Sequence, residues 1–213
     1  MTRHPSRALR HVVAFTLALA TASSVALAQQ QQQEPPPVRL RGQIESVAGQ
    51  RLTINERGGE TVQVQLADEP RILAVSPAEL ESVGPGTFIG TAAVPQPDGT
   101  LRALELVVFP EEMRGTGEGH YPWDLTPEST MTNATVEAMV SEAKGEALTL
   151  TYPGGEQTIV VPPETPIVTL APGDAGLLQP GAHVFVPGAT EQPDGTFAAQ
   201  VIAVGRDGLV PPM

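Results

Sequence analysis

The stretch QPDGT occurs twice in the chain, at Gln96–Thr100 and again at Gln192–Thr196, 96 positions later. In such a stretch proline presets the backbone of the first turn position. Aspartate accepts hydrogen bonds from the following backbone, and glycine adopts the positive φ that ends the turn. We therefore interpret QPDGT as the loop of a β-hairpin, present twice because the domain that contains it is present twice.

Further matches between the two parts of the chain support this interpretation, since residues that favour turns and apolar residues recur in the same order. The matches predict that residues 38–110 and 134–206 are duplicated domains. At the offset of 96, or of 95 after a one-residue deletion, the aligned residues are Leu52-Thr53 with Leu148-Thr149, Gly58-Gly59-Glu60 with Gly154-Gly155-Glu156, Pro70 with Pro166, Pro77 with Pro172, and Pro85-Gly86 with Pro180-Gly181.

Each half has the two-residue period of strands with one buried face. In the first half Leu52 and Ile54 alternate with polar residues, and Leu148 and Leu150 repeat the pattern in the second. Five or six short strands with one small helix predict a small, closed or partly closed OB-like barrel in each half, with a pair of β-sandwiches as the alternative. The predicted fold class is all-β: two tandem small OB-like β-barrels related by internal duplication, with little helix.

One helical turn is predicted in the first half. Ser76 suits the N-cap, Pro77 the first helical position, and Glu79 completes a capping box. The corresponding stretch of the second half, residues 171–176, lacks this cap and contains two glycines. We expect a short or absent helix there.

The start of the chain has the pattern of a secretory signal peptide. Arg3, Arg7 and Arg10 precede an apolar run, and Ala26-Leu27-Ala28 supplies small residues for cleavage before Gln29. A membrane anchor is the alternative, but the apolar run is shorter than the ~20 residues that span a bilayer. We expect a signal peptide over residues 1–28, a disordered Gln/Pro-rich tether over residues 29–37, and localisation in the periplasm or outside the cell.

Composition excludes several classes of partner and site. The chain has a formal net charge of −12, and loss of the signal peptide removes three arginines and no acids, which makes it −15. Phosphate backbones and anionic lipid surfaces should repel such a protein, so nucleic acid is a poor partner. No cysteine is present, which excludes disulfides and thiolate metal sites. No later segment has membrane-spanning length.

The clearest unrepeated stretch is residues 111–133, EEMRGTGEGHYPWDLTPESTMTN, which contains the only tryptophan of the chain. Gly115, Gly117 and Gly119 argue against regular structure there. Connections of this length in compact domains are usually functional or disordered. We interpret the stretch as a Gly/aromatic linker between the two barrels, and residues 207–213 as a C-terminal tail.

Two interpretations of the linker concern its aromatic residues. Tyr121 and Trp123 would pack against a barrel and set how the two domains lie. Alternatively, Tyr121, Trp123 and Asp124 would form an exposed recognition patch, since tyrosine and tryptophan are enriched at interfaces.

The third interpretation is a metal site. Glu118, His120 and Asp124 would bind Zn or Cu, with Met113 or Met131 as a further ligand, although no standard ligand spacing is present. Taken together, the predicted binding residues are His120, Tyr121, Trp123 and Asp124. No cofactor is predicted, and a bound metal belongs to this third interpretation alone.

Other candidates for a site are ordinary structural positions. His183 aligns with Phe88, which marks a strand position. The chain has no G-x-S-x-G elbow, so no catalytic residue is predicted.

The duplicated unit resembles a bacterial secreted family of uncharacterised OB-like domains that occur in tandem. The resemblance rests on LTI or LTL, GGE, a central proline stretch and the terminal PDGT hairpin. The segment MRGTGEGHYPWDL…STMTNATV resembles a two-copy branch, some members of which carry a name implying a metal-transport permease. A permease needs several membrane spans, which this chain lacks after its signal peptide.

The sequence therefore predicts a non-enzymatic, secreted or periplasmic binding or structural module, with an unknown protein or small ligand as its partner. A soluble metal-handling accessory protein centred on His120 is the alternative. A hydrolase of envelope polymers is the second alternative.

Overall fold

The computed structural model describes residues 37–142 and 145–213. The predicted signal peptide, and the predicted tether apart from Pro37, lie outside the described residues. The described part consists of strands and single-turn 3-10 helices, so the predicted all-β class with little helix is confirmed. The strands are β1 (Val38–Ala48), β2 (Arg51–Glu56), β3 (Thr61–Pro77), β4 (Phe88–Pro95), β5 (Leu101–Ala103), β6 (Leu106–Val108), β7 (Gly119–Pro122), β8 (Thr130–Glu142), β9 (Gly145–Tyr152), β10 (Gly155–Val161), β11 (Ile167–Pro172), β12 (His183–Glu191) and β13 (Phe197–Gly205), and the 3-10 turns are η1 (Leu80–Ser82), η2 (Glu111–Met113), η3 (Ala175–Leu177) and η4 (Arg206–Gly208).

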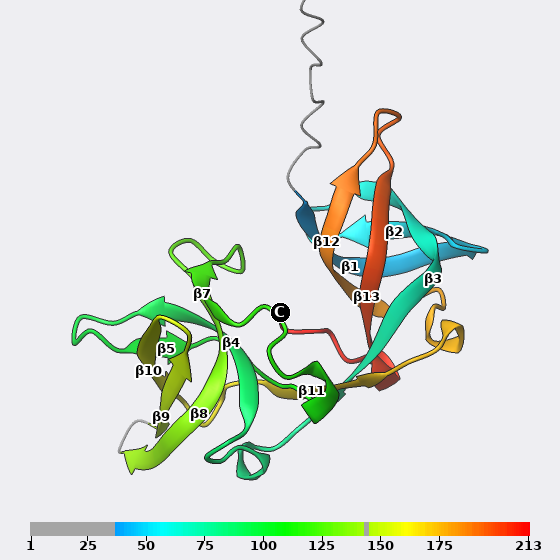
Figure 1. The fold of residues 1–213 in the computed structure, drawn as a ribbon. Helices are drawn as coiled ribbons and strands as arrows, with labels where there is room; N and C mark the ends of the chain where they lie inside the picture. The colour runs from blue at the N-terminus through cyan, green and yellow to red at the C-terminus, as the bar shows by residue number, and fades with distance from the viewer. Residues whose placement is uncertain (1–36, 143–144) are drawn as a thin grey trace, which may run out of the picture. The chain divides into compact units, whose positions relative to one another are not determined.

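Five strands form a closed barrel (Figure 1). β2 pairs with β1 and β3, β13 pairs with β3 and β12, and β12 pairs with β1, which completes the circle. This closure is that of a barrel and excludes the sandwich alternative for these strands. Its interior is lined by the alternate apolar residues of each strand, among them Ile44, Leu52, Ile54, Val64 and Ile202.

A second ring of pairings joins five other strands. β4 pairs with β5 and β8, β9 pairs with β8 and β10, and β10 pairs with β5. Buried side chains of these strands, including Ile89, Leu148, Leu150 and Ile159, form a separate apolar cluster together with Leu106 of β6.

The predicted domain boundaries do not coincide with these two rings, and we correct them. The first ring takes β1–β3 from the first half of the chain and the hairpin β12–β13 from the second. The second ring takes β8–β10 from the second half and β4–β5 from the first. The two halves thus exchange their last hairpins. The physical reason is β3, which spans 17 residues and, after a bulge at residues 67–70, continues to Pro77 in pairing with β13 and then β11. The chain therefore leaves the first ring before it can turn back.

The pairing of β3 with β11 has the symmetry expected of such an exchange. Val75 lies opposite Leu170, 95 positions later, which is the offset that aligns Pro77 with Pro172. The same offset of 95 takes Leu73 to Val168 and Pro77 to Pro172, so it converts the pair Pro77–Val168 into the pair Leu73–Pro172. Two copies of one unit around a local two-fold axis that passes between Val75 and Leu170 would adopt this register. The duplication itself stays a prediction.

Both QPDGT stretches are hairpin loops, as predicted, and their hydrogen bonds are alike. The backbone N–H of Gln96 donates to the carbonyl of Thr100 at 2.8 Å, and that of Gln192 donates to Thr196 at 2.7 Å. In both loops the aspartate Oδ1 accepts from the backbone N–H of the threonine at 3.0 Å and from its hydroxyl at 2.7 Å. Gly99 and Gly195 have φ values of 86° and 80°. Gly58-Gly59 likewise lies between β2 and β3, while in the second pair Gly154 lies between β9 and β10 and Gly155 begins β10.

The predicted helix cap at Ser76 is wrong. Ser76 belongs to β3, because pairing with β11 keeps this strand extended as far as Pro77. The turn η1 begins only at Leu80, and its N-cap Glu79 makes no side-chain cap. In the second half the turn is short, as predicted, but it does have a cap, since the side chain of Asp174 accepts from Gly176 at 2.7 Å.

The predicted linker contains regular structure, contrary to the expectation from its glycines. β7 pairs with β8 from Gly119–Asn133 to Pro122–Thr130, and the β8 residues 130–135 also pair with β4. The predicted boundary at residue 133 therefore falls inside a strand of the second ring. Gly119 begins this edge strand with a φ of 140°, a backbone conformation that residues with a side chain rarely adopt. A glycine at this position therefore helps the strand to begin.

A third apolar cluster joins residues of the first ring and of β6 and β11 with residues 109–123 and the last residues of the chain. Its members are Leu73, Val75, Val107, Met113, Val168, Leu170, Phe185, Ala203 and Met213, with Phe109, Trp123, Val201 and Leu209 packed against them. Across the described ranges, no helix has the length and apolar character needed to traverse a bilayer.

Candidate functional site

A cavity of about 350 Å³ lies within the third cluster. Four aromatic side chains line it, together with three methionines, two arginines and one asparagine. These residues are Phe109, Tyr121, Trp123, Phe185, Met113, Met131, Met213, Arg39, Arg71 and Asn133. They come from strands of both rings and from the predicted linker, so the exchange of hairpins is what brings them together.

β7 delivers its side chains to two different environments, because successive residues of a strand point to opposite faces. Tyr121 lines the cavity. Its neighbour His120 instead places Nδ1 2.8 Å from the hydroxyl of Thr132 and stacks on Tyr152 with ring centroids 6.3 Å apart. Burial lowers the pKa of His120 and raises the pKa of Tyr121, the latter against the charge of Arg39.

Trp123 joins the predicted linker to the first barrel. The guanidinium of Arg39 lies 3.8 Å from the centroid of its ring, within the range of a cation–π contact. Phe185 and Tyr121 meet the same ring edge-on, at 6.3 Å and 6.1 Å. The indole Nε1 is buried and has no hydrogen-bond partner among the described residues.

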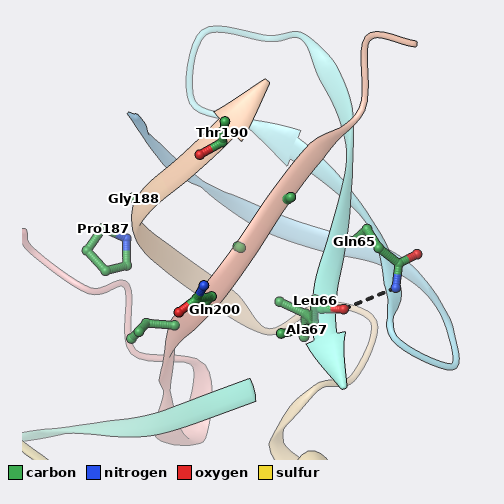
Figure 2. A pocket seen from close by; sticks show the side chains of 10 residues that line it. Gln65, Leu66, Ala67, Pro187, Gly188, Thr190 and Gln200 are labelled. Atoms are coloured by element: carbon green, nitrogen blue, oxygen red, sulfur yellow. Dashed lines mark hydrogen bonds between the residues drawn. The ribbon is translucent and has the colours of Figure 1, made fainter. Parts of the chain in front are cut away.

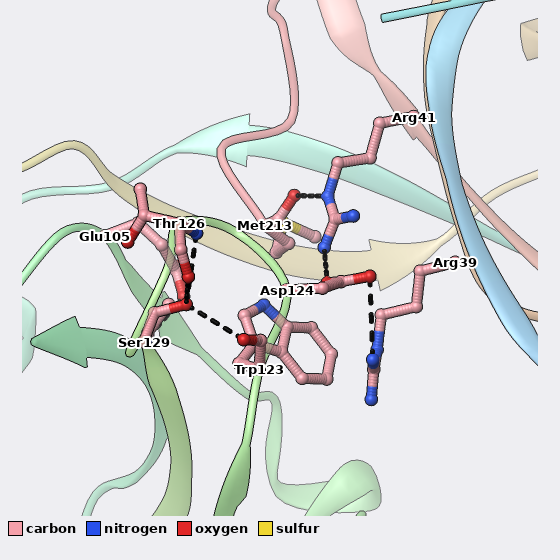
Figure 3. Close-up of polar contacts among 9 residues, drawn as sticks. Arg39, Arg41, Glu105, Trp123, Asp124, Thr126, Ser129 and Met213 are labelled. Carbon is pink, nitrogen blue, oxygen red and sulfur yellow. Dashed lines mark hydrogen bonds and ion pairs between the residues drawn. The ribbon is translucent and has the colours of Figure 1, made fainter. Parts of the chain in front are cut away.

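Asp124 is held by two arginines of β1 (Figure 3). Its carboxylate accepts from Arg41 at 2.6 Å and lies 3.7 Å from Arg39. Arg41 also donates through Nε to the backbone oxygen of Met213 at 2.6 Å. Partial burial by itself would raise the pKa of Asp124, but the hydrogen bond from Arg41 and the charges of both arginines outweigh it, so the pKa lies below its ordinary value.

Asn133 is the most deeply buried polar side chain of the cavity, with 7% of its surface exposed. Its Nδ2 donates to the carbonyl of Thr116 at 3.0 Å and to the Tyr121 hydroxyl at 3.3 Å, which sets the orientation of the amide. Its Oδ1 has no partner among the described residues. A side chain on Gly90 would not fit, since a Cβ there would lie 2.5 Å from this oxygen and 2.9 Å from Phe109.

Glu105 is a fully buried acid that the sequence interpretation missed. Its Oε1 accepts from the backbone N–H of Ala92 at 2.7 Å, whereas Oε2 has no partner in the described part of the chain. Burial raises the pKa of Glu105 to about 8, against the opposing effects of the Ala92 hydrogen bond and the charge of Arg41. A signal was present in the sequence, because the offset of 96 aligns Glu105 with the apolar Val201.

The structure separates the four residues predicted to bind. Tyr121 and Trp123 line the cavity, Asp124 is paired with arginines, and His120 faces the opposite side of β7. Within residues 37–142 and 145–213, no group of three or more His, Cys, Asp and Glu is close enough to hold a metal ion. The predicted grouping of Glu118, His120 and Asp124 is therefore not formed. Sequence reasoning did not find Arg39, Arg71, Asn133, Phe185 or Met213.

A second hollow, of about 620 Å³, lies on the closed barrel beside β12 and β13 (Figure 2). It follows from Pro187, which has no N–H to donate and leaves the β12–β13 ladder open between Phe185–Ala203 and Ala189–Ala199. Neither an aromatic nor an ionisable side chain lines this hollow in the described structure. The aromatic cavity has the richer chemistry, so we take it as the candidate site.

No protein-family model, curated protein or solved structure matches the chain. The resemblance to a family of tandem OB-like domains thus stays a prediction.

Proposed function

We propose that the protein is a non-enzymatic binding module, exported to the periplasm or beyond, that takes a small ligand into the cavity beside Trp123. The observation that carries this proposal is the unpartnered Oδ1 of the buried Asn133 on the wall of an aromatic cavity. Binding cavities are mostly apolar and carry a few convergent polar groups, and small-molecule cavities begin at about 300 Å³.

The polar atoms of the cavity favour binding over simple packing. Leaving a buried polar group without a partner costs about 1–3 kcal/mol. The buried and unpartnered atoms Asn133 Oδ1, Trp123 Nε1 and Arg39 Nε all belong to residues that line the same cavity. A ligand that supplies hydrogen-bond partners to these atoms would recover part of that cost.

Trp123 is the only tryptophan of the chain, so its fluorescence reports directly on the cavity. We expect a library of small organic molecules to contain ligands that change this emission saturably. Ala203→Leu, which places a larger side chain in the cavity, should abolish the response, whereas Ala198→Leu in the other hollow should retain it. Circular dichroism checks that both variants fold.

The bound ligand should be recovered chemically unchanged after prolonged incubation, as judged by chromatography. Turnover of a ligand would contradict the non-enzymatic assignment. A library with no saturable response, or a response equal in both variants, would contradict binding in this cavity.

A further inference from the structure

The charge of the cavity selects the sign of its ligand. Arg39 and Arg71 line it, and no Asp or Glu does so among the described residues. Asp124 pairs closely with Arg41, at 2.6 Å, and only loosely with Arg39, at 3.7 Å. Arg71 forms no ion pair with any described residue. In a chain with a net charge of −12, this wall is a local positive region that favours an anion.

The aromatic side chains and the volume of the cavity favour a ligand with one aromatic ring. Phe109, Tyr121, Trp123 and Phe185 present flat apolar faces and edges. A volume of about 350 Å³ is roughly twelve times the space of one water molecule, at about 30 Å³ each. A single-ring compound of about a dozen non-hydrogen atoms matches this size.

The side-chain oxygen of Asn133 favours a ligand that carries a hydrogen-bond donor. Its amide cannot turn over without losing the hydrogen bond to the Thr116 carbonyl, which accepts only. The unpartnered Oδ1 therefore needs a donor. Trp123 Nε1 and Arg39 Nε, both unpartnered, need acceptors instead.

We infer that the ligand is a small carboxylate with a planar ring that carries a hydroxyl or N–H donor away from its acid group. The inference rests on the binding function proposed above and narrows its ligand class. The carboxylate lies towards Arg39 and Arg71, the ring lies among the aromatic side chains, and the donor meets Asn133.

Four probes of one shape test the class by calorimetry: 4-hydroxyphenylacetate, phenylacetate, 4-hydroxyphenylacetamide and tyramine. We expect 4-hydroxyphenylacetate to bind best. Phenylacetate, which lacks the donor, should bind about fivefold more weakly, and the neutral amide about tenfold more weakly, since hydrogen bonds to charged groups are stronger. The cation tyramine should not bind measurably.

A charge variant tests the same point from the side of the protein. Arg71→Met should weaken 4-hydroxyphenylacetate about tenfold, while Arg51→Met, which removes an exposed arginine outside the cavity, should leave the affinity unchanged.

Several results would overturn the inference. One is equal affinity for tyramine or for the amide, and another is no effect of Arg71→Met. Equal affinity for phenylacetate would remove the donor requirement. Saturable binding of Ag(I) that is lost in Met113→Leu would place a soft metal ion in the cavity instead. If none of the four probes binds but the fluorescence screen finds ligands sensitive to Ala203→Leu, the ligand class is wrong and the binding function stands.

Discussion

The guanidinium of Arg39 lies 3.8 Å from the centre of the Trp123 ring, which couples strand β1 to a residue 84 positions later. This contact, with the edge-on approach of Phe185 to the same ring, places the predicted linker against the first barrel. Trp123 thus contributes to the packing between the predicted linker and the first barrel, and it also lines the cavity.

Trp123→Ala should therefore destabilise the protein. A fully buried tryptophan costs about 3–5 kcal/mol on truncation to alanine, and Trp123 is only half-buried, so we expect about 2 kcal/mol from lost packing and the lost cation–π contact. Urea unfolding followed by circular dichroism measures the change. Trp123→Phe, which keeps an aromatic ring, should lose less, and an unchanged midpoint for Trp123→Ala would favour the exposed-patch interpretation instead.

Glu105 should make stability depend on pH. The pKa is raised by burial to about 8, so the folded state keeps the proton above the pKa of the unfolded state, near 4.5. Its contribution is fully present below pH 4.5 and is lost as the pH rises through 8, at up to about 1.4 kcal/mol per pH unit in between.

Glu105→Gln, which keeps an acceptor for Ala92 but cannot ionise, should remove this slope. Urea unfolding at pH 5, 6 and 7 should show that the free energy of unfolding of Glu105→Gln rises relative to that of the native chain at each higher pH. The exposed control Glu81→Gln should have the same pH dependence as the native chain. Parallel curves for Glu105→Gln and the native chain would show that Glu105 does not carry this pH dependence.

The positive φ of the hairpin glycines predicts a cost for any side chain there. Gly99→Ala and Gly195→Ala should each lower the free energy of unfolding by about 1 kcal/mol, because L-residues are disfavoured in this region. Gly188→Ala is the matched control, since Gly188 is exposed, lacks a positive φ, and its Cβ would make only an ordinary contact with Pro37 at 3.8 Å. Thermal unfolding that ranks the three variants alike would contradict this account.

The exchange of hairpins can be tested by a disulfide. Gln43 of β1 lies opposite His183 of β12, and the chain has no cysteine of its own. Gln43→Cys combined with His183→Cys should form an intramolecular disulfide under mild oxidation, visible as a faster band on a non-reducing gel, in a protein that elutes as the native chain does. The single variants should not shift. Failure to cross-link in a folded double variant would contradict the pairing of β1 with β12.

The metal hypothesis leads to a further measurement. Because His120 contacts Thr132 and Tyr152 on the face of β7 away from the cavity, His120→Ala should not change Zn(II) affinity. Calorimetry with Zn(II) on both proteins measures this. Tight binding that disappears in the variant would restore the alternative of a metal-handling protein.

The sequence by itself determined the local structure. Proline, aspartate and glycine in QPDGT specify a hairpin loop through bonds between near neighbours, and the alternation around Leu52 and Leu148 specifies half-buried strands. Each of these features depends on residues a few positions apart, so the local pattern is sufficient to predict them. The all-β class follows from the same features.

Only the tertiary structure decided which strands close each ring and where a site lies. The strands β1–β3 could in principle close with the hairpin β4–β5 or with the hairpin β12–β13, and the same choice exists for β8–β10. The two hairpins have similar sequences, so no local pattern tells which one closes which ring. The continuation of β3 past its bulge and its pairing with β11, in which Val75 lies opposite Leu170, make that choice. The cavity arises from that choice, because Arg39, Asn133 and Phe185 belong to distant segments that meet only when the hairpins are exchanged.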